Sequence, residues 1–120
     1  MTEYLTLEDL LTLCADLGVG PIRDLGLLDA AAHRPQAGLF GRRAYPDLDT
    51  QAAVLLESIV GNYALVDGNK RLGWLATVVF FGLNDVTLEA PDDDAYVLVL
   101  AVARSETSLD DIVAALRSWH

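Results

Sequence analysis

Hydrophobic residues recur with a helical period through most of this chain, and short polar breaks separate the periodic segments. A first helix is predicted between Thr6, a hydroxyl cap with an acidic residue three positions later, and Gly18, a stop. Its apolar face comprises five residues: Leu7, Leu10, Leu11, Cys14 and Leu17. The pattern therefore predicts an amphipathic helix that packs on a core.

The same signals predict five further helices. Capping residues mark their starts, and proline or asparagine marks two of their ends. The expected helices are the second from Asp24 to Pro35, the third from Asp49 or Thr50 through Leu65, the fourth from Lys70 to Asn84, the fifth capped by Asp92 and the sixth capped by Ser108. The β-branched run "YVLVLAV" in the fifth also suits a strand, but it has no neighbouring strand partners and is assigned as helix.

The fourth segment, "KRLGWLATVVFFGLN", is apolar nearly all round, as expected of a helix surrounded by others. Residues 36–48 lack a helical period and contain two glycines and a proline, which predicts a loop or a short β-hairpin. Asn84, at the end of the fourth helix, is expected in the left-handed conformation. The predicted fold class is all-α, a compact bundle of about six helices around a buried central helix.

Composition bounds the chain to a single domain over residues 1–120, with 52% hydrophobic and 22% charged residues. A net charge of -10 argues against direct nucleic-acid binding, and the longest apolar run is too short to cross a membrane. Cys14, the sole cysteine, excludes an internal disulfide and is expected to fill space on a helix. With no secretory signal at the N-terminus, we expect a cytoplasmic protein.

The stretch "DGNKR" places Lys70 and Arg71 in the first turn of a helix, where cations are disfavoured. An anion held between these cations and the free amides of the turn would compensate for their position. Gly68 lets the backbone approach a ligand, Asn69 can cap the helix or donate from its amide, and Asp67 offers a carboxylate suited to Mg²⁺. Together these residues predict a nucleotide phosphate site.

Two observations limit that prediction. "DGN" is also an ordinary turn sequence, and a lysine and arginine at a helix start can simply be solvated. The spacing does not match a Walker-type phosphate loop, which needs two glycines flanking four residues, followed by lysine and a hydroxyl residue.

The segment "NYALVDGNKRLGWLATVVFFGLN" resembles the signature of the Fic/Doc superfamily, in particular its Doc (death-on-curing) toxin branch, whose motif reads H-x-F-x-D-[A/G]-N-K-R. Asp67 to Arg71 match five consecutive positions, and Leu65 replaces the phenylalanine. The opening "LTLEDLL" and the segment before the motif are also similar, so the resemblance covers essentially the whole chain. It implies an all-α Fic fold.

The resemblance implies a bacterial toxin of a toxin–antitoxin module that uses ATP and Mg²⁺. Doc proteins transfer a phosphate to a threonine of elongation factor Tu and stop translation, whereas the wider family usually transfers AMP. Lys70 matches the Doc form of the motif, with AMP transfer as the alternative. In this assignment Gly68, Asn69, Lys70 and Arg71 bind the phosphates, and Asp67 binds the metal.

Tyr63 stands where the family has its catalytic histidine. A neutral imidazole accepts a proton at pH 7, whereas a phenol is still protonated and is a poor base. We therefore expect this chain to be inactive or nearly so. Because tyrosine and histidine codons differ by a single base, we interpret it as a detoxified copy of an active toxin. The alternative is a natural non-catalytic module that binds a nucleotide or a partner. The two histidines of the chain, His33 and His120, are not placed by sequence to replace the missing catalytic histidine.

The resemblance also implies two protein contacts. A flap, residues 38–47, would hold the target protein next to the phosphate donor through Arg42, Arg43, Ala44 and Tyr45. The flap arginines, Lys70 and Arg71 are half of the eight cations in the chain, and we expect them around one cleft. A Phd-like antitoxin would fold as a helix on an apolar groove, for which exposed residues of the first two helices are candidates.

Overall fold

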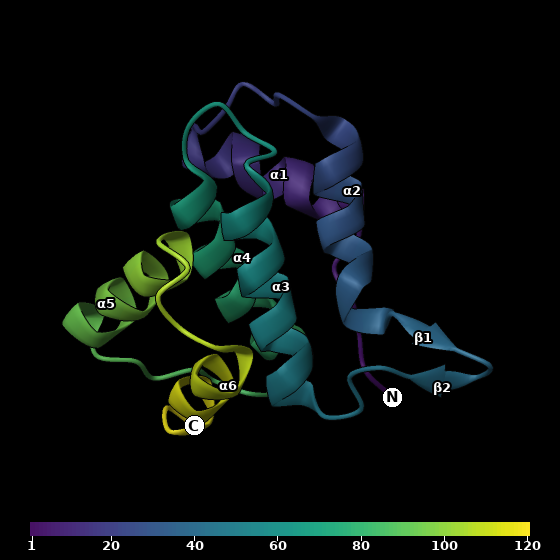
Figure 1. Cartoon of the computed structure of the whole chain (residues 1–120). Coiled ribbons are helices and arrows are strands. Elements are labelled where there is room, and N and C mark those ends of the chain that lie inside the picture. Colours follow the sequence, from purple (N-terminus) through teal and green to yellow (C-terminus); the bar gives the residue numbers. More distant parts are fainter.

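The computed structural model describes all 120 residues and contains six α-helices, one short 3₁₀ helix and one two-stranded hairpin (Figure 1). The elements in chain order are α1 (Leu7–Leu17), α2 (Leu25–His33), the 3₁₀ helix η1 (Arg34–Gln36), β1 (Gly38–Leu39), β2 (Arg42–Arg43), α3 (Leu48–Asn62), α4 (Asn69–Leu83), α5 (Asp92–Ala103) and α6 (Leu109–Arg117). The predicted all-α fold class is confirmed, and "YVLVLAV" is helical as expected.

Side-chain caps start three of the six helices at the residues that the sequence predicts. Thr6 and Asp9 form a reciprocal capping box at α1, and the carboxylate of Asp24 accepts a hydrogen bond from the Leu27 amide at α2. Ser108 caps α6 in the same way. These caps satisfy amides that have no partner inside the helix, which is why short polar residues mark the starts.

Three predicted boundaries are wrong by one or two residues. The N-cap of α3 is Asp47, so this helix begins before Asp49 and Thr50. Pro91 occupies the N-cap of α5 in an extended conformation, and Asp92 is already the first helical residue. The negative charge of Asp92 there still interacts favourably with the helix dipole. α2 stops at His33, and the chain continues through Pro35 as η1.

Asn84 ends α4 as expected, but it is not left-handed, because its φ is -109° and Asp85 takes the positive φ of 64° instead. The side-chain amide of Asn84 donates to the carbonyl of Phe80 at 2.8 Å and to that of Glu3 at 2.9 Å. Its side-chain oxygen accepts from the backbone amide of Glu3. These bonds tie the N-terminal segment to α4 and set the orientation of Asn84.

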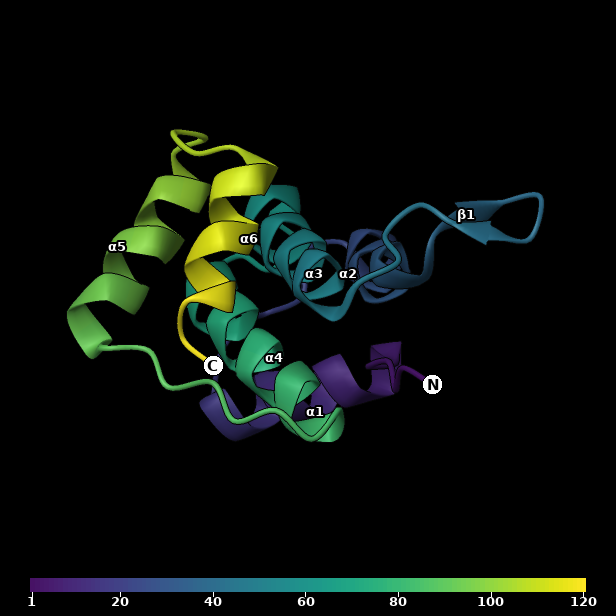
Figure 2. The same cartoon turned by 90° about the horizontal axis from the view of Figure 1, so that it is seen from below.

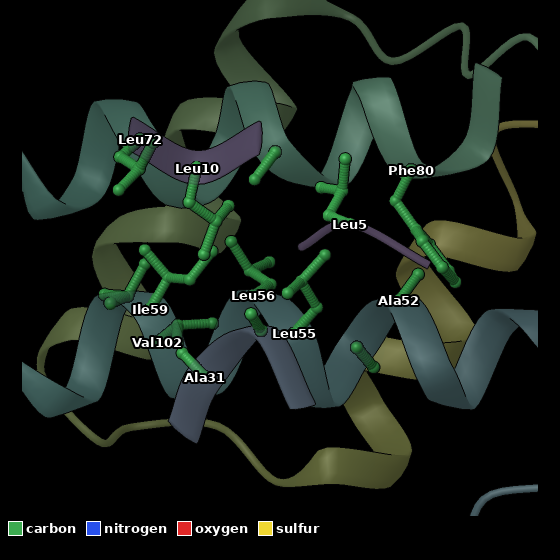
Figure 3. Close-up of a cluster of buried hydrophobic side chains, with 14 of the residues drawn as sticks. Leu5, Leu10, Ala31, Ala52, Leu55, Leu56, Ile59, Leu72, Phe80 and Val102 are labelled. Carbon is green, nitrogen blue, oxygen red and sulfur yellow. The ribbon is translucent and has the colours of Figure 1, made fainter. Parts of the chain in front are cut away.

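The core lies between α3 and α4, which run side by side in opposite directions (Figures 1 and 3). Nine residues of α3 and six of α4 are buried, and α3 packs against α4 and also against α2, η1, α5 and α6. The more central helix is therefore α3, not the fourth helix as its composition suggested. An apolar sequence indicates that a helix is buried. Only tertiary packing decides which of two buried helices contacts more of the other elements.

The remaining helices cover this pair. Figure 3 shows Leu10, Ala31 and Val102, from α1, α2 and α5, directed toward the same cluster. Cys14 is buried within it, and burial raises the pKa of its thiol, which agrees with its expected role as a space filler. None of the helices combines the length and apolar character that a bilayer span requires.

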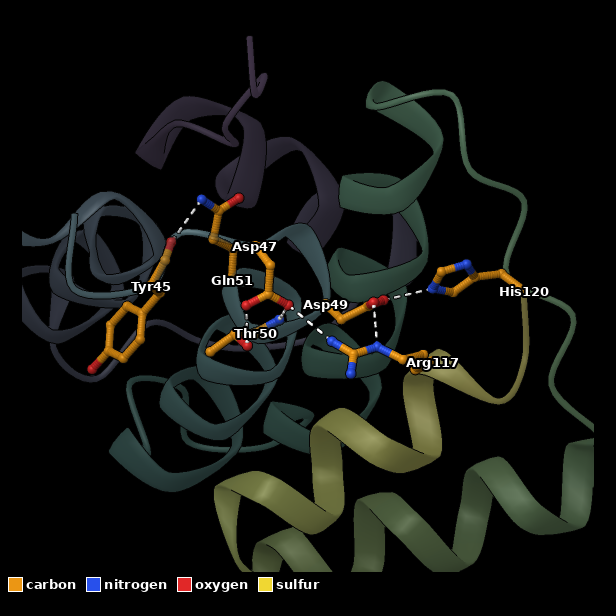
Figure 4. Close-up of polar contacts among 7 residues, drawn as sticks. All are labelled: Tyr45, Asp47, Asp49, Thr50, Gln51, Arg117 and His120. Atoms are coloured by element: carbon orange, nitrogen blue, oxygen red, sulfur yellow. Dashed lines mark hydrogen bonds and ion pairs between the residues drawn. The ribbon is translucent and has the colours of Figure 1, made fainter.

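The chain's C-terminal end is fastened to the start of α3 (Figure 4). Arg117 donates to the carboxylate of Asp47 at 3.1 Å and to that of Asp49 at 3.0 Å, and His120 lies 2.5 Å from Asp49. Burial raises the pKa of Asp47, but hydrogen bonds from Thr50 and the charge of Arg117 outweigh burial and hold it below its usual value. α6 thereby helps to fix the start of α3.

The predicted hairpin is present in residues 38–43, with Gly38 opposite Arg43 and Leu39 opposite Arg42. Its two turn residues, Phe40 and Gly41, both have positive φ, at 53° and 73°, as in the turns that match strand twist. Figure 2 shows the hairpin extending from one side of the molecule and α5 and α6 on the other.

Close contact between α3 and α4 depends on Gly73. A Cβ at this position would lie 2.6 Å from Cγ2 of Val60 and 3.3 Å from Cδ1 of Leu56. We predict that Gly73→Ala lowers the free energy of unfolding by about 1–3 kcal/mol, because overpacking outweighs the better helix propensity of alanine. Urea denaturation followed by circular dichroism measures this change.

Gly82 is the matched control, because it lies in the same helix with nothing within 4 Å of an added Cβ. Gly82→Ala is expected to raise the free energy of unfolding by about 0.5–1 kcal/mol. Equal effects of the two substitutions would contradict the packing role of Gly73.

Candidate functional site

The site begins where α3 ends. Tyr63 adopts φ 53° and ψ 43°, a left-handed conformation that ends α3 and reverses the chain. The last helical residue is Asn62, so the predicted helix through Leu65 is three residues too long. The Tyr63 side chain is 55% exposed. A six-residue segment, the motif loop (residues 63–68), then leads to α4.

Backbone pairing holds the motif loop against the linker between α1 and α2 (residues 18–24). Ile22 and Leu65 form an isolated antiparallel bridge, and the Val66 amide donates to the carbonyl of Pro21 at 2.9 Å. The Ala64 carbonyl accepts from the amides of residues 23 and 24, at 2.7 and 3.0 Å, and the Gly20 amide donates to the Asp67 carbonyl. The loop is therefore exposed on one side but hydrogen-bonded on the other.

Asn69 closes the loop from the inside. Its side-chain amide donates to the carbonyl of Leu65 at 2.9 Å, and its oxygen accepts from the Leu65 amide at 3.0 Å. The predicted cap role of Asn69 is wrong, because Gly68 occupies the N-cap of α4 without a side-chain cap, and the Asn69 amide donates within the loop. Leu65 is 2% exposed, so the residue at the usual phenylalanine position anchors the loop in the core.

Gly68 is required by the fold of the loop itself. Its φ of 97° is one that L side chains rarely adopt, and an added Cβ would lie 2.5 Å from Cγ1 of Val19. The sequence suggested that this glycine allows a ligand to approach. The structure adds a separate reason, since the glycine lets the linker pack against the start of α4.

The start of α4 carries unpaired donors beside two cations. The backbone amides of residues 69–71 have no acceptor in the protein. The hydrogen bonds of this helix begin with the Leu72 amide, which donates to the Gly68 carbonyl. Lys70 makes no ion pair, and Arg71 lies 3.9 Å from Asp67 with both groups largely exposed. Free amides and uncompensated positive charge together suit a bound anion.

One pocket of about 250 Å³ gathers the predicted site residues from Tyr63 to Arg71. Its lining consists of Val60, Tyr63, Val66, Asp67, Gly68, Asn69, Lys70, Arg71 and Ala103. No group of three or more His, Cys, Asp or Glu side chains forms a metal cage anywhere in the chain. A lone exposed carboxylate at Asp67 still fits Mg²⁺, which takes one or two carboxylates together with substrate phosphates.

The flap lies apart from this pocket, so the expected single cleft with four cations is wrong. Arg43 contacts the hydroxyl and ring of Tyr4, and Tyr4 stacks on Phe80 near the C-terminal end of α4. Lys70 and Arg71 are at the other end of this fifteen-residue helix, nine or ten residues from Phe80 and so about 15 Å along the axis at a helical rise of 1.5 Å per residue. Figure 1 shows the hairpin and the motif loop at opposite ends of α3.

The other flap residues have local contacts. The Ala44 amide donates to the Ala37 carbonyl at 2.8 Å, and the Tyr45 carbonyl accepts from Gln51 at 2.9 Å (Figure 4). Arg42 makes no hydrogen bond or ion pair through its side chain, and Phe40 at the tip is 94% exposed. The flap therefore presents an apolar and basic tip to solvent.

An apolar groove of about 630 Å³ lies between α4 and α5 and meets the pocket at Lys70 and Arg71. Its lining consists of Leu17, Lys70, Arg71, Trp74, Leu75, Val78, Asp92, Ala95, Tyr96, Val99 and Leu100. The first two helices were the expected source of an apolar groove, but they contribute only Leu17. Most of their other apolar residues pack into the core or against it, although Leu25 at the start of α2 is 51% exposed.

Comparison with known proteins agrees with this geometry. The Fic/DOC family model matches residues 4–81, which include the motif loop and all of α4 except its end. The chain therefore belongs to the Fic/Doc family. It is 49% identical to Toxin Doc of Mycolicibacterium smegmatis over 99% of this chain and 95% of the relative, so the similarity includes α5 and α6.

Sequence patterns did not identify the linker as part of the site. Residues 18–24 were interpreted only as a break between two helices, yet Val19 fits against Gly68, and Arg23 reaches the end of α3. Such contacts join residues about 40 to 50 positions apart, and no local period marks them. The proline and glycines of the linker were its only signal.

We predict that Gly68→Ala lowers the free energy of unfolding by about 2 kcal/mol, because it combines a left-handed backbone with a clash against Val19. Val19→Gly removes the Cβ and both methyl groups of Val19, all of which would lie within 3.3 Å of the added Cβ, so the double variant should lose less stability than the sum of the two single variants. Urea denaturation of all four proteins measures this difference. Strict additivity would show that Val19 does not constrain residue 68.

Proposed function

We propose that this protein is a Doc-type toxin of a toxin–antitoxin module and that its chemistry is phosphate transfer from ATP to a threonine hydroxyl of elongation factor Tu. Membership of the Fic/Doc family supports a transferase-type enzyme, and the full-length similarity to Toxin Doc supports the toxin assignment. Lys70 in the Doc form of the motif favours phosphate transfer over AMP transfer.

The observation that carries the proposal is the convergence of anion-binding groups in one small pocket. The free amides of residues 69–71 and the side chains of Lys70 and Arg71 can bind the phosphates of ATP. Asp67 would hold Mg²⁺, which neutralises charge on the phosphates when it is bound. The rigid motif loop would keep these donors in place during the transfer.

Residue 63 limits the rate in this proposal. The threonine hydroxyl must lose a proton as it attacks, and the side chain at position 63 lines the pocket next to the phosphate-binding residues. Tyrosine is a poor proton acceptor at neutral pH, and loss of a general base typically costs ~10² to 10⁴ in rate. The chain as it stands would bind ATP but transfer phosphate slowly, as expected of a detoxified toxin.

The target would also contact the flap, and this second contact would lie away from the pocket. Because the hairpin lies at the far end of α4, it would hold a part of elongation factor Tu distant from the reacting threonine. Its exposed Phe40 and the free guanidinium of Arg42 suit a surface with apolar and acidic groups.

We predict that Tyr63→His raises phosphate transfer to elongation factor Tu by ~10² to 10⁴ over the unchanged chain, because imidazole can accept the proton of the threonine. Purified target incubated with each protein and Mg-ATP is analysed by mass spectrometry. Tyr63→Phe, which has no titrating group, is the matched control and should stay as slow as the unchanged chain.

The adduct decides between the chemical alternatives. A phosphate on a threonine supports the proposal, whereas an AMP adduct would assign the protein to the AMP-transferring branch. ATP binding without either adduct from Tyr63→His would favour a non-catalytic nucleotide-binding module.

We further propose that the apolar groove between α4 and α5 binds a Phd-like antitoxin. Eight of its eleven lining residues are hydrophobic, and its cationic end at Lys70 and Arg71 adjoins the pocket. An amphipathic helix with acidic residues toward that end would complement it. Occupation of the groove would place the antitoxin beside the phosphate-binding residues and explain neutralisation.

Adjacent residues of α5 provide a matched test. Tyr96 lines the groove and Val97 does not, yet their exposed fractions are similar at 66% and 63%. Tyr96→Asp should weaken binding of the protein encoded by the neighbouring antitoxin reading frame at least tenfold, since it places a charge in an apolar contact, and Val97→Asp should not. Isothermal titration calorimetry measures both, and equal affinities would remove the groove as the binding surface.

A further inference from the structure

Arg23 connects the linker directly to the end of α3. Its Nε donates to the carbonyl of Tyr63 at 2.7 Å, and its Nη2 donates to the carbonyl of Asn62 at 3.4 Å. The two carbonyls belong to the last turn of α3 and to the left-handed residue that follows it. The guanidinium thus serves as a side-chain cap for the C-terminus of this helix, where cations are favoured by the dipole.

No other donor in the protein reaches these two carbonyls. The Val66 amide, which would bond to Asn62 if the helix continued, donates to Pro21 instead. The cap of α3 makes no backbone bond from the Tyr63 amide, in contrast to the Gly18 cap of α1. Arg23 is consequently the one group that donates to the carbonyls of Asn62 and Tyr63 at the chain reversal.

The reversal itself is costly. A residue with a Cβ in the left-handed region costs about 1–2 kcal/mol relative to the right-handed helix, and such conformations persist when surrounding contacts hold them. Side-chain direction at position 63 depends on this backbone, because φ and ψ determine where Cβ points. Whatever fixes the Tyr63 carbonyl therefore also fixes the direction of the side chain into the pocket.

We propose that Arg23 is a positioning residue, which holds the backbone of residue 63 in its left-handed conformation and thereby directs the side chain at the proton-accepting position toward the phosphate pocket. The consequence for catalysis rests on the proposed function, whereas the conformational role does not. The guanidinium contacts only backbone carbonyls of residues 62 and 63, so it acts through residue 63 and not on the substrate.

Removal of the Arg23 side chain should not detach the loop. The backbone amides of residues 23 and 24 still donate to the Ala64 carbonyl, and the Ile22–Leu65 bridge and the Asn69 bonds are independent of the guanidinium. Arg23 is also exposed, so its truncation leaves no cavity. The expected change is a local one at the Tyr63–Ala64 peptide.

The first experiment uses the chain with Tyr63 in place and needs no activity. In ¹⁵N–¹H spectra, Arg23→Ala should shift or broaden the amide signals of Tyr63 and Ala64, while signals from the core of α3 stay in place. Arg104→Ala is the matched control, because Arg104 makes no hydrogen bond or ion pair through its exposed side chain. Unchanged Tyr63 and Ala64 signals in Arg23→Ala would overturn the proposal.

The second experiment measures phosphate transfer in the Tyr63→His background. Adding Arg23→Ala should lower kcat about 10- to 100-fold with little change in the KM for ATP, since a small misplacement of a reacting group has effects of this size. Arg23→Lys should recover part of the rate, because an ammonium can donate to the carbonyls without the planar fork of arginine. Arg104→Ala should leave kcat unchanged.

The outcomes separate the two proposals. If Tyr63→His alone transfers no group to the target, the proposed function fails, and the spectra alone decide the role of Arg23. If Tyr63→His is active and Arg23→Ala keeps the same kcat, or raises the KM for ATP without lowering kcat, the positioning role is wrong.

Discussion

Antiparallel packing of α3 against α4 is the constraint on which the rest of the structure depends. The two helices contribute about half of the buried residues, 15 of 31, and Gly73 allows them to approach closely enough for Val60 to fill the interface. Only six residues connect them, so the chain must reverse sharply at the end of α3. The motif loop is that reversal, which is why its conformation includes two residues with positive φ, Tyr63 and Gly68.

A reversal of this kind leaves backbone groups without helical partners, and the linker between α1 and α2 supplies them. Hydrogen bonds from residues 20 to 24 satisfy one side of the loop, and Asn69 satisfies the inner side. The other side retains free amides at the start of α4 with Lys70 and Arg71 beside them. The same requirement for hydrogen bonding thus holds the loop on one side and leaves free amides on the other, where an anion would be favoured.

The pocket and the apolar groove lie at one end of α4, and the flap lies at the other. The pocket and the apolar groove meet at Lys70 and Arg71, so a partner in the groove would be close enough to affect a ligand in the pocket. The flap lies at the far end of α4 and is fastened there through Arg43 and Tyr4. A target protein would have to span the length of this helix to contact both the flap and the pocket.

Local sequence rules determined the helices and their caps at Thr6, Asp24 and Ser108, because capping and periodicity act within a few positions. They also singled out the run from Asp67 to Arg71, which lines one pocket. They were less accurate where distant contacts decide the outcome. α3 stops at Asn62, three residues short of the predicted end at Leu65, since the linker pairs with the loop and Arg23 bonds to a carbonyl 40 residues away. Tertiary packing alone made α3 the central helix, separated the flap from Lys70 and Arg71, and opened the apolar groove beside α5, because each depends on how whole helices fit together.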